Sequence, residues 1–318
     1  MNTSDVRQEP LWPLILLALS MACANSAGAA LLVYEPFDYD DGTVLHDTGA
    51  TGQNLVGNYQ STNAAIPDQF QLTVDSPGLT YGALSGAPGA TGNRLSQPSG
   101  TTSNGGKVDV DQDVLVGPGE SIFWSALLTF DDSQNGNHLA SVVFTNDDNG
   151  DLLSFGEAAV GGRAIRVEAD TAATGMLVAV GEDGAFTSGQ TLLLVGRYLN
   201  SAAAGGDRLD LVGYDTADAI TLPASFDPGD PSAQFAYELA GLDIDFAKIT
   251  SITFRIRAND NNFIDELRIG RTYGDVLIPE PCAAVLAWLG GMIWILQHRG
   301  GWRMRANGLK AARRQSPS

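Results

Sequence analysis

The chain has 318 residues and a formal net charge of −19 at pH 7. A surface this acidic repels polyanions, so the composition excludes nucleic-acid binding by electrostatic attraction. Two explanations of the charge stay open: repulsion between copies that keeps the protein soluble, or the binding of divalent cations.

The two cysteines, Cys23 and Cys282, lie near the two ends of the chain. The region 30–277 between them therefore holds no disulfide and no thiolate metal site. A stretch of this length can bury a large core without such cross-links. We expect residues 30–277 to form one domain, because no internal repeat and no second change of composition divides them.

Residues 1–29 have the features of a secretory signal peptide. An apolar segment runs from Leu11 to Ala24, and small residues suited to cleavage follow at Ala27-Gly28-Ala29. The basic N-terminal region is weak because it carries acids as well. Lipidation at Cys23 is a minor alternative, since the leucine before it lies one position too far away.

Residues 30–277 show the alternation of apolar and polar residues that predicts β-strands. From Ile122 to Phe130 the even-numbered residues, Trp124 among them, are apolar, whereas the odd-numbered ones are mixed. Apolar residues likewise alternate with polar ones from Ser251 to Arg257. Further strands are predicted at His138–Asn146, Asp151–Phe155, Arg163–Glu168, Met176–Val180, Thr191–Leu199 and Asp207–Tyr214.

A last strand is predicted after the turn-forming residues 259–262. Strict alternation would place one set of its side chains on one face, namely Phe263, Asp265, Leu267 and Ile269, and the other set opposite, namely Ile264, Glu266 and Arg268. Residues 81–106, rich in small residues, are expected to form surface loops around one short strand near Arg94. Many short strands with regular turns predict an all-β fold, a two-sheet antiparallel β-sandwich or jelly roll.

Several segments of this region resemble exported concanavalin A-like domains. They are Leu32–Tyr39, Thr191–Tyr198 with the following Asp207–Leu211, and Phe263–Gly270. The resemblance implies a laminin G-like or lectin-like jelly roll of two antiparallel sheets. Most members of the group that this resemblance points to lack an assigned activity.

We find no catalytic constellation in the sequence and expect no enzyme, although a glycoside hydrolase stays an alternative. Glucanases of the concanavalin A-like class use a Glu-x-Asp-x-x-Glu strand, but here Glu168-Ala169-Asp170 is followed by Ala173 at the last position. Asp265 and Glu266 are adjacent, so alternation predicts that they point to opposite faces. Structural roles, such as ion pairs with Arg255, Arg257 or Arg268, are favoured for these two acids. Two histidines, His46 and His138, are too few for a convincing zinc site.

Calcium is the one cofactor that the sequence leaves open. Asp131, Ser133 and Asn135, followed by Gly136, match the first half of an EF-hand loop, in which oxygen ligands recur at every second residue. Val142 stands where that loop has its bidentate glutamate. A solvated β-turn is therefore the favoured alternative.

The C-terminal segment, 278–318, predicts a transmembrane helix at 282–298 with a basic cytoplasmic tail. Residues 282–296 are uncharged, six basic residues follow, and no acid occurs after Glu280. This asymmetry places the tail inside the cell by the positive-inside rule. Fifteen residues at helical rise cover about 22 Å, less than the hydrocarbon core of about 30 Å. A buried core helix is the alternative.

Pro279, Glu280 and Pro281 precede this span, and the whole segment resembles the PEP-CTERM sorting signal of exported bacterial proteins. The resemblance implies that an exosortase, a membrane-embedded transpeptidase, processes the chain near the motif. Two features depart from the usual pattern: Cys282 follows the motif directly, and the basic tail is long.

These observations predict an exported protein that is held in the inner membrane and then sorted to the cell surface or the extracellular matrix of a biofilm. Its sandwich is expected to have a binding or structural role, such as adhesion to an extracellular polysaccharide or to a protein. An ordinary periplasmic protein with a single-span anchor is the alternative.

Overall fold

The computed structural model describes residues 31–62, 71–84, 92–97, 103–130, 140–146, 150–157, 165–171, 175–180, 189–242, 246–257 and 262–277. These ranges fall within one compact unit, Gly28–Pro279. The predicted signal peptide (1–29), the motif Pro279-Glu280-Pro281 and the predicted transmembrane helix (282–298) lie outside them. In the ranges given, no helix is long and apolar enough to cross a membrane.

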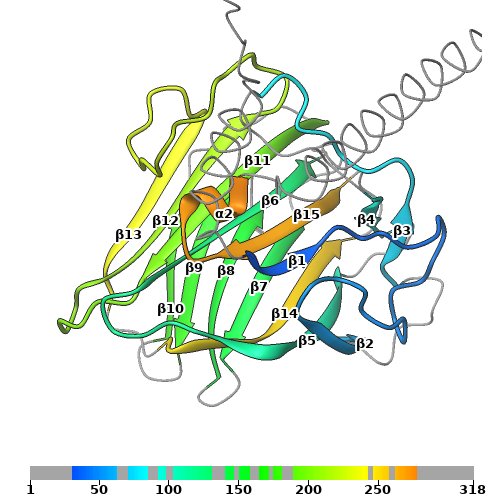
Figure 1. The fold of residues 1–318 in the computed structure, drawn as a ribbon, viewed down its shortest axis with the longest axis horizontal. Helices are drawn as coiled ribbons and strands as arrows, with labels where there is room; N and C mark the ends of the chain where they lie inside the picture. Colours follow the sequence, from blue (N-terminus) through cyan, green and yellow to red (C-terminus); the bar gives the residue numbers. More distant parts are fainter. Residues whose placement is uncertain are drawn as a thin grey trace, which may run out of the picture. The chain divides into compact units, whose positions relative to one another are not determined.

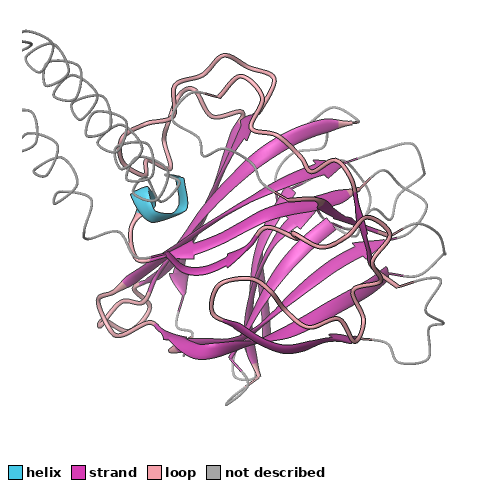
Figure 2. Ribbon diagram, turned by 45° about the vertical axis from the view of Figure 1, so that its right-hand side comes forward, coloured by secondary structure: helices cyan, strands magenta, loops and turns pink. Residues whose placement is uncertain are grey.

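The described strands form two antiparallel sheets that pack face to face (Figures 1 and 2). The eight-stranded sheet has the order β13 (Phe235–Leu242), β12 (Asp207–Asp215), β11 (Gln190–Leu199), β6 (Ser121–Phe130), β15 (Phe263–Gly270), β4 (Arg94–Ser96) and β3 (Thr73–Asp75), with β1 (Leu31–Glu35) also paired to β15. The seven-stranded sheet has the order β10 (Gly175–Val180), β9 (Ile165–Thr171), β8 (Asp151–Glu157), β7 (Ala140–Asn146), β14 (Lys248–Arg257), β5 (Ser103–Leu115) and β2 (Leu55–Ser61). The all-β, two-sheet antiparallel prediction is confirmed.

The main core lies between the two sheets and follows the predicted alternation. On β6 the even-numbered residues from Ile122 to Phe130 are all in this core. Trp124 packs edge-on against Phe144 of β7, with the ring centroids 5.5 Å apart. Burying one large apolar side chain stabilises a fold by about 1.5–3 kcal/mol, so this interlayer cluster contributes strongly to the association of the sheets.

A second, smaller core covers the outer face of the eight-stranded sheet. Leu127, Leu193 and Val195 of this face are buried beneath loop residues and the short helix α2 (Tyr273–Leu277). Strand β11 is therefore buried on both faces, which explains its uninterrupted apolar run. The sequence analysis did not predict this second layer.

Strand β15 departs from the predicted alternation. Asp265 pairs with Leu127 of β6 and Arg268 with Ser125, so three steps along β15 match two along β6. Glu266 takes the extra position of this β-bulge with a φ of 54°. Consequently Ile264, Leu267 and Ile269 face the main core, as the buried set shows. The prediction that Asp265 shares a face with Leu267 and Ile269 is wrong.

Candidate functional site

The outward positions of the seven-stranded sheet carry small, hydroxyl-bearing and charged side chains together with Val143, and most of those on β14, β7 and β8 are buried. On β14, Phe254 and Ile256 point into the main core, so Thr253 and Arg255 point outward. The same logic places Ser141 of β7 on this outer face. Thr253 and Ser141 are nevertheless buried, at 5% and 6% exposed, whereas Arg255 is exposed.

Two arginines of this face share one row across four strands. Arg255 on β14 pairs with Ser141 on β7, which pairs with Gly156 on β8, which pairs with Arg166 on β9. Three strand spacings of about 4.8 Å put the two arginine Cα atoms about 14 Å apart. Only a serine and a glycine stand between them, and the glycine has a φ of 138°, with the Ala140 carbonyl oxygen where a Cβ would clash with it. A larger side chain is thus excluded from the position between the arginines.

The neighbouring row supplies a carboxylate to one of the two arginines. Arg166 Nη2 lies 3.0 Å from Glu168 Oε2, and the Ser154 hydroxyl donates to the same oxygen at 3.2 Å. The Glu168 side chain is only 9% exposed, so its position is held by these contacts.

Arg255 differs from Arg166 because it is exposed and has no carboxylate within ion-pair distance among the described residues. The pKa of Arg255 is lowered, mainly by partial burial of its guanidinium and further by the positive charge of Arg166, while Glu168 opposes the shift. Arg255 therefore retains unused hydrogen-bond donors next to the positively charged Arg166.

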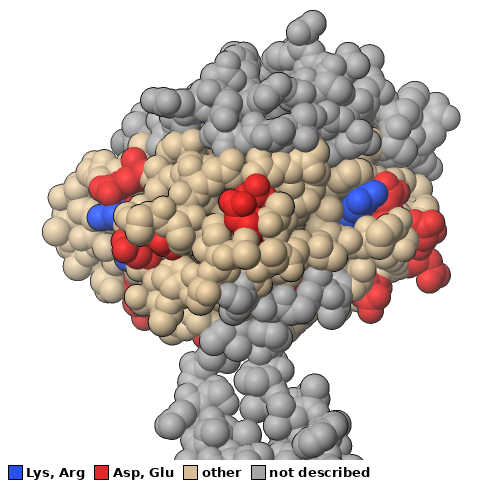
Figure 3. All heavy atoms as spheres, turned by 90° about the horizontal axis from the view of Figure 1, so that it is seen from above, with Lys and Arg blue, Asp and Glu red and all other residues tan. Residues whose placement is uncertain are grey.

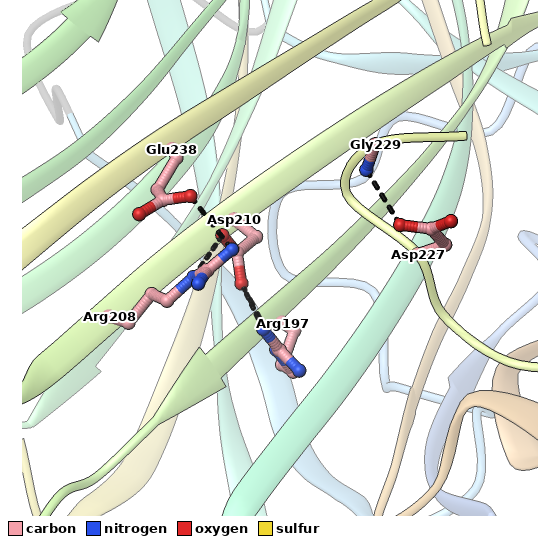
Figure 4. Close-up of polar contacts among 6 residues, drawn as sticks. All are labelled: Arg197, Arg208, Asp210, Asp227, Gly229 and Glu238. Atoms are coloured by element: carbon pink, nitrogen blue, oxygen red, sulfur yellow. Dashed lines mark hydrogen bonds and ion pairs between the residues drawn. The ribbon is translucent and has the colours of Figure 1, made fainter. Parts of the chain in front are cut away.

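The outer face of the eight-stranded sheet carries a different charged group, which is internally neutralised (Figure 4). Asp210 of β12 is fully buried and accepts hydrogen bonds from Arg197 Nη2 at 2.6 Å and from Arg208 Nε at 2.7 Å. Arg208 also lies 2.8 Å from Glu238 of β13. These bonds tie β11, β12 and β13 together, and both arginines have their charge matched within the sheet.

Elsewhere on the described surface, basic side chains are also found close to acidic ones. Acidic side chains are spread over the face drawn in Figure 3, and the basic side chains visible there lie beside acidic ones. Arg271, for example, lies 3.1 Å from Glu120. An exposed arginine without an ion pair is therefore unusual in the part of this acidic protein that the structure describes.

Buried carboxyl groups gather where β1 meets the bulge of β15. Glu35 accepts hydrogen bonds from the Tyr59 hydroxyl at 2.5 Å and from the Phe37 amide at 2.8 Å. Burial raises the pKa of Glu35 to about 7, although these hydrogen bonds oppose the shift. Burial also raises the pKa of Asp265 to about 9, with a further contribution from the nearby charge of Glu266.

These acids contact their own chain. Asp265 accepts from the amides of Leu79 and Glu266 at 2.7 and 2.8 Å. Glu266 pairs with Arg268 at 3.0 Å, one of the ion pairs given as examples, whereas the structural role of Asp265 is met by backbone amides and not by an arginine among the described residues. Glu35, Asp265 and Glu266 are all 0% exposed, so in this structure no substrate can reach their oxygens.

The other predicted site residues are placed as follows. Asp131, Ser133 and Asn135 lie outside the described residues, as do Pro279, Glu280 and Pro281. Within the described ranges, no group of three or more His, Cys, Asp or Glu residues could hold a metal ion. His46 accepts from the Ser61 amide at 3.2 Å and lies 3.1 Å from Asp47, which is a local structural role.

The sequence pattern does not predict the Arg255–Arg166 pair. It placed Arg255 on the polar side of its strand, but the two arginines are brought together by strand register across β7 and β8. The usable signal was the excess of serine, threonine and arginine at the outward positions of β14.

The described residues define an all-β sandwich whose eight-stranded sheet carries a second core on its outer face and whose seven-stranded sheet carries the exposed Arg255 on its outer face. No protein-family model matches the chain, and no curated protein matches its sequence. Among solved structures, lectin II from Ulex europaeus is 9% identical over 76% of this chain and 99% of its own, with a TM-score of 0.41. The lumenal domain of VIP36, in a form bound to calcium and Man3GlcNAc, is 12% identical over 56% and 78%, with a TM-score of 0.36.

The binding domain of botulinum neurotoxin serotype D is 11% identical over 79% of this chain and 49% of its own, with a TM-score of 0.42. Scores of this size carry no argument about function. The functional assignment rests on the residues of this chain.

Proposed function

We propose that the chain is an exported, non-catalytic β-sandwich of the concanavalin A-like class that binds glycans of the extracellular matrix through the outer face of its seven-stranded sheet. The signal peptide at 1–29 would export it. The 282–298 helix would hold it in the inner membrane until an exosortase acts near Pro279-Glu280-Pro281. The protein would then stay at the cell surface or in the matrix.

The observation that carries the binding role is the exposed Arg255, which has no ion pair among the described residues. Sugars offer many oxygen acceptors, and a guanidinium with free N–H groups can donate to them. A sheet face that served only as a solvated surface would gain nothing from placing two arginines on one row, since like charges repel.

Binding is tested with the full-length chain, purified in detergent micelles, on an array of neutral and carboxylated bacterial and plant polysaccharides. We expect retention on at least one polysaccharide, with release by the same polysaccharide in solution. The proposal is wrong if the folded protein, checked by a strand-type circular dichroism spectrum, is retained by none of them.

A further inference from the structure

We infer that the row from Arg255 to Arg166 is a binding site for the carboxylate of an acidic sugar unit, and that the ligand is a polysaccharide containing uronic acids. This inference rests on the proposed glycan-binding function and specifies its ligand. It follows from the charge and spacing of four residues on the outer face of the seven-stranded sheet.

The first argument is charge balance. Arg255, Arg166 and Glu168 together leave one positive charge unmatched, because Glu168 lies within ion-pair distance of Arg166 but not of Arg255. An arginine presents N–H groups in a planar fork that fits the two oxygens of a carboxylate. An anionic group between the arginines would match the remaining charge and relieve the repulsion between them.

The second argument is space and neighbouring groups. Ser141 and Gly156 occupy the positions between the arginines, and these two residues have no large side chain that would fill the space between the guanidinium groups. Ser154 and Glu168 lie one row away, but both are buried and bonded to each other, so the ligand contacts fall on the arginines, above all on the exposed Arg255. A carboxylate fits the guanidinium fork, and the sugar that carries it follows from the proposed function.

The third argument concerns the rest of the surface. The chain is strongly acidic, so densely charged polyanions are repelled at long range. In about 0.15 M salt the Debye length is about 8 Å, and an anionic group seated between two arginines then experiences mainly their charge. The arrangement favours a saccharide with local contacts over a nucleic acid.

The test measures binding of the full-length chain in detergent micelles to immobilised polygalacturonate and to the same polymer after reduction of its carboxyl groups. Because charge-assisted hydrogen bonds of arginine are lost on reduction, we expect the reduced polymer to bind about tenfold more weakly or worse. Arg255→Ala should remove this preference. Arg255→Lys keeps the charge without the fork and should retain part of it.

Arg271→Ala is the matched control, because it removes one positive charge from an exposed ion pair outside this face. Its affinity should stay within about twofold of the unmodified chain, since exposed pairs contribute little. Each variant is first shown to melt at the temperature of the unmodified chain.

Equal binding of both polymers, or a preference for polygalacturonate that Arg255→Ala leaves intact, overturns this site but leaves glycan binding standing. Failure to bind either polymer, when other polysaccharides on the array are retained, overturns the uronic acid as ligand. Failure on every polysaccharide contradicts the proposed function itself.

Discussion

The buried carboxyl group of Glu35 makes the stability of the sandwich depend on pH in a defined direction. In the folded protein its pKa is raised from 4.5 to about 7, mainly because burial disfavours the charged form. A folded-state pKa above the unfolded value means that the protonated group stabilises the fold fully below about pH 4.5. This contribution is lost as the pH rises through 7.

The size of the effect follows from the two pKa values. A difference from 4.5 to about 7 corresponds to about 3 kcal/mol of unfolding free energy above pH 7. Replacing Glu35 by Gln removes the titration and keeps one oxygen that can accept from the Phe37 amide, while the side-chain NH2 group, in place of the second oxygen, can donate to the Tyr59 hydroxyl oxygen. We expect Glu35→Gln to be close to the unmodified protein at pH 4.5 and more stable than it at pH 8, by up to about 3 kcal/mol.

The measurement is urea unfolding of both proteins at a series of pH values, with their difference in unfolding free energy plotted against pH. The difference cancels the titration of acids that do not interact with Glu35, whereas the charge of Glu35 contributes to the raised pKa of Asp265. Glu238→Gln serves as the control, because Glu238 is 48% exposed and its pair with Arg208 lies on the surface. A difference between Glu35→Gln and the unmodified protein that does not change with pH would refute the reasoning.

Three further predictions concern other parts of the chain. Asp210→Ala removes the fully buried partner of two arginines and should lower the unfolding free energy by about 2–3 kcal/mol. The control Asp227→Ala removes only the turn hydrogen bond from the Gly229 amide and should lower it by less than about 1 kcal/mol, so equal losses in urea unfolding would contradict the prediction. Glu280→Ala should leave export intact but trap the full-length chain in the inner membrane, as immunoblots of cell fractions would show; release as efficient as that of the unmodified chain would make the motif a simple linker. If the turn at 131–135 gathers calcium, a chelator should lower Tm and calcium restore it, whereas no shift up to millimolar calcium would show an ordinary turn.

Local alternation was enough to predict the strands that border the main core. Trp124 and its even-numbered neighbours were assigned to the buried face of β6, and Phe254 to that of β14, and both assignments are confirmed. These strands keep period two without interruption, so the sequence pattern maps directly onto the two faces of each sheet.

The bulge at Glu266 could not be predicted in the same way. It adds one residue to β15 and reverses which side chains face the core, and its cause is tertiary. The amide of Leu79 binds Asp265, and Tyr34 and Arg268 bind Glu266. The sequence of the strand does not predict the contacts with Leu79 and Tyr34, which lie 186 and 232 positions away.

Strand β13 was also missed, because Phe235–Leu242 is rich in residues that favour helices, such as alanine, leucine and glutamate. Pairing with β12 overrides that local preference. The same dependence on register hid the candidate site: Arg255 and Arg166 belong to strands separated by almost ninety residues in the chain. Only the order β9-β8-β7-β14 places them on one row.

The ligand surface of the sandwich is tested most directly by NMR of the full chain in detergent micelles, with ¹⁵N-labelled arginine and added trigalacturonate. The Nε–H signals of Arg255 and Arg166 should shift in a saturable way, whereas those of Arg197 and Arg208, which are bound to Asp210, should stay in place. Shifts confined to Arg197 and Arg208, or no shift at any arginine, would contradict a ligand surface on the seven-stranded sheet.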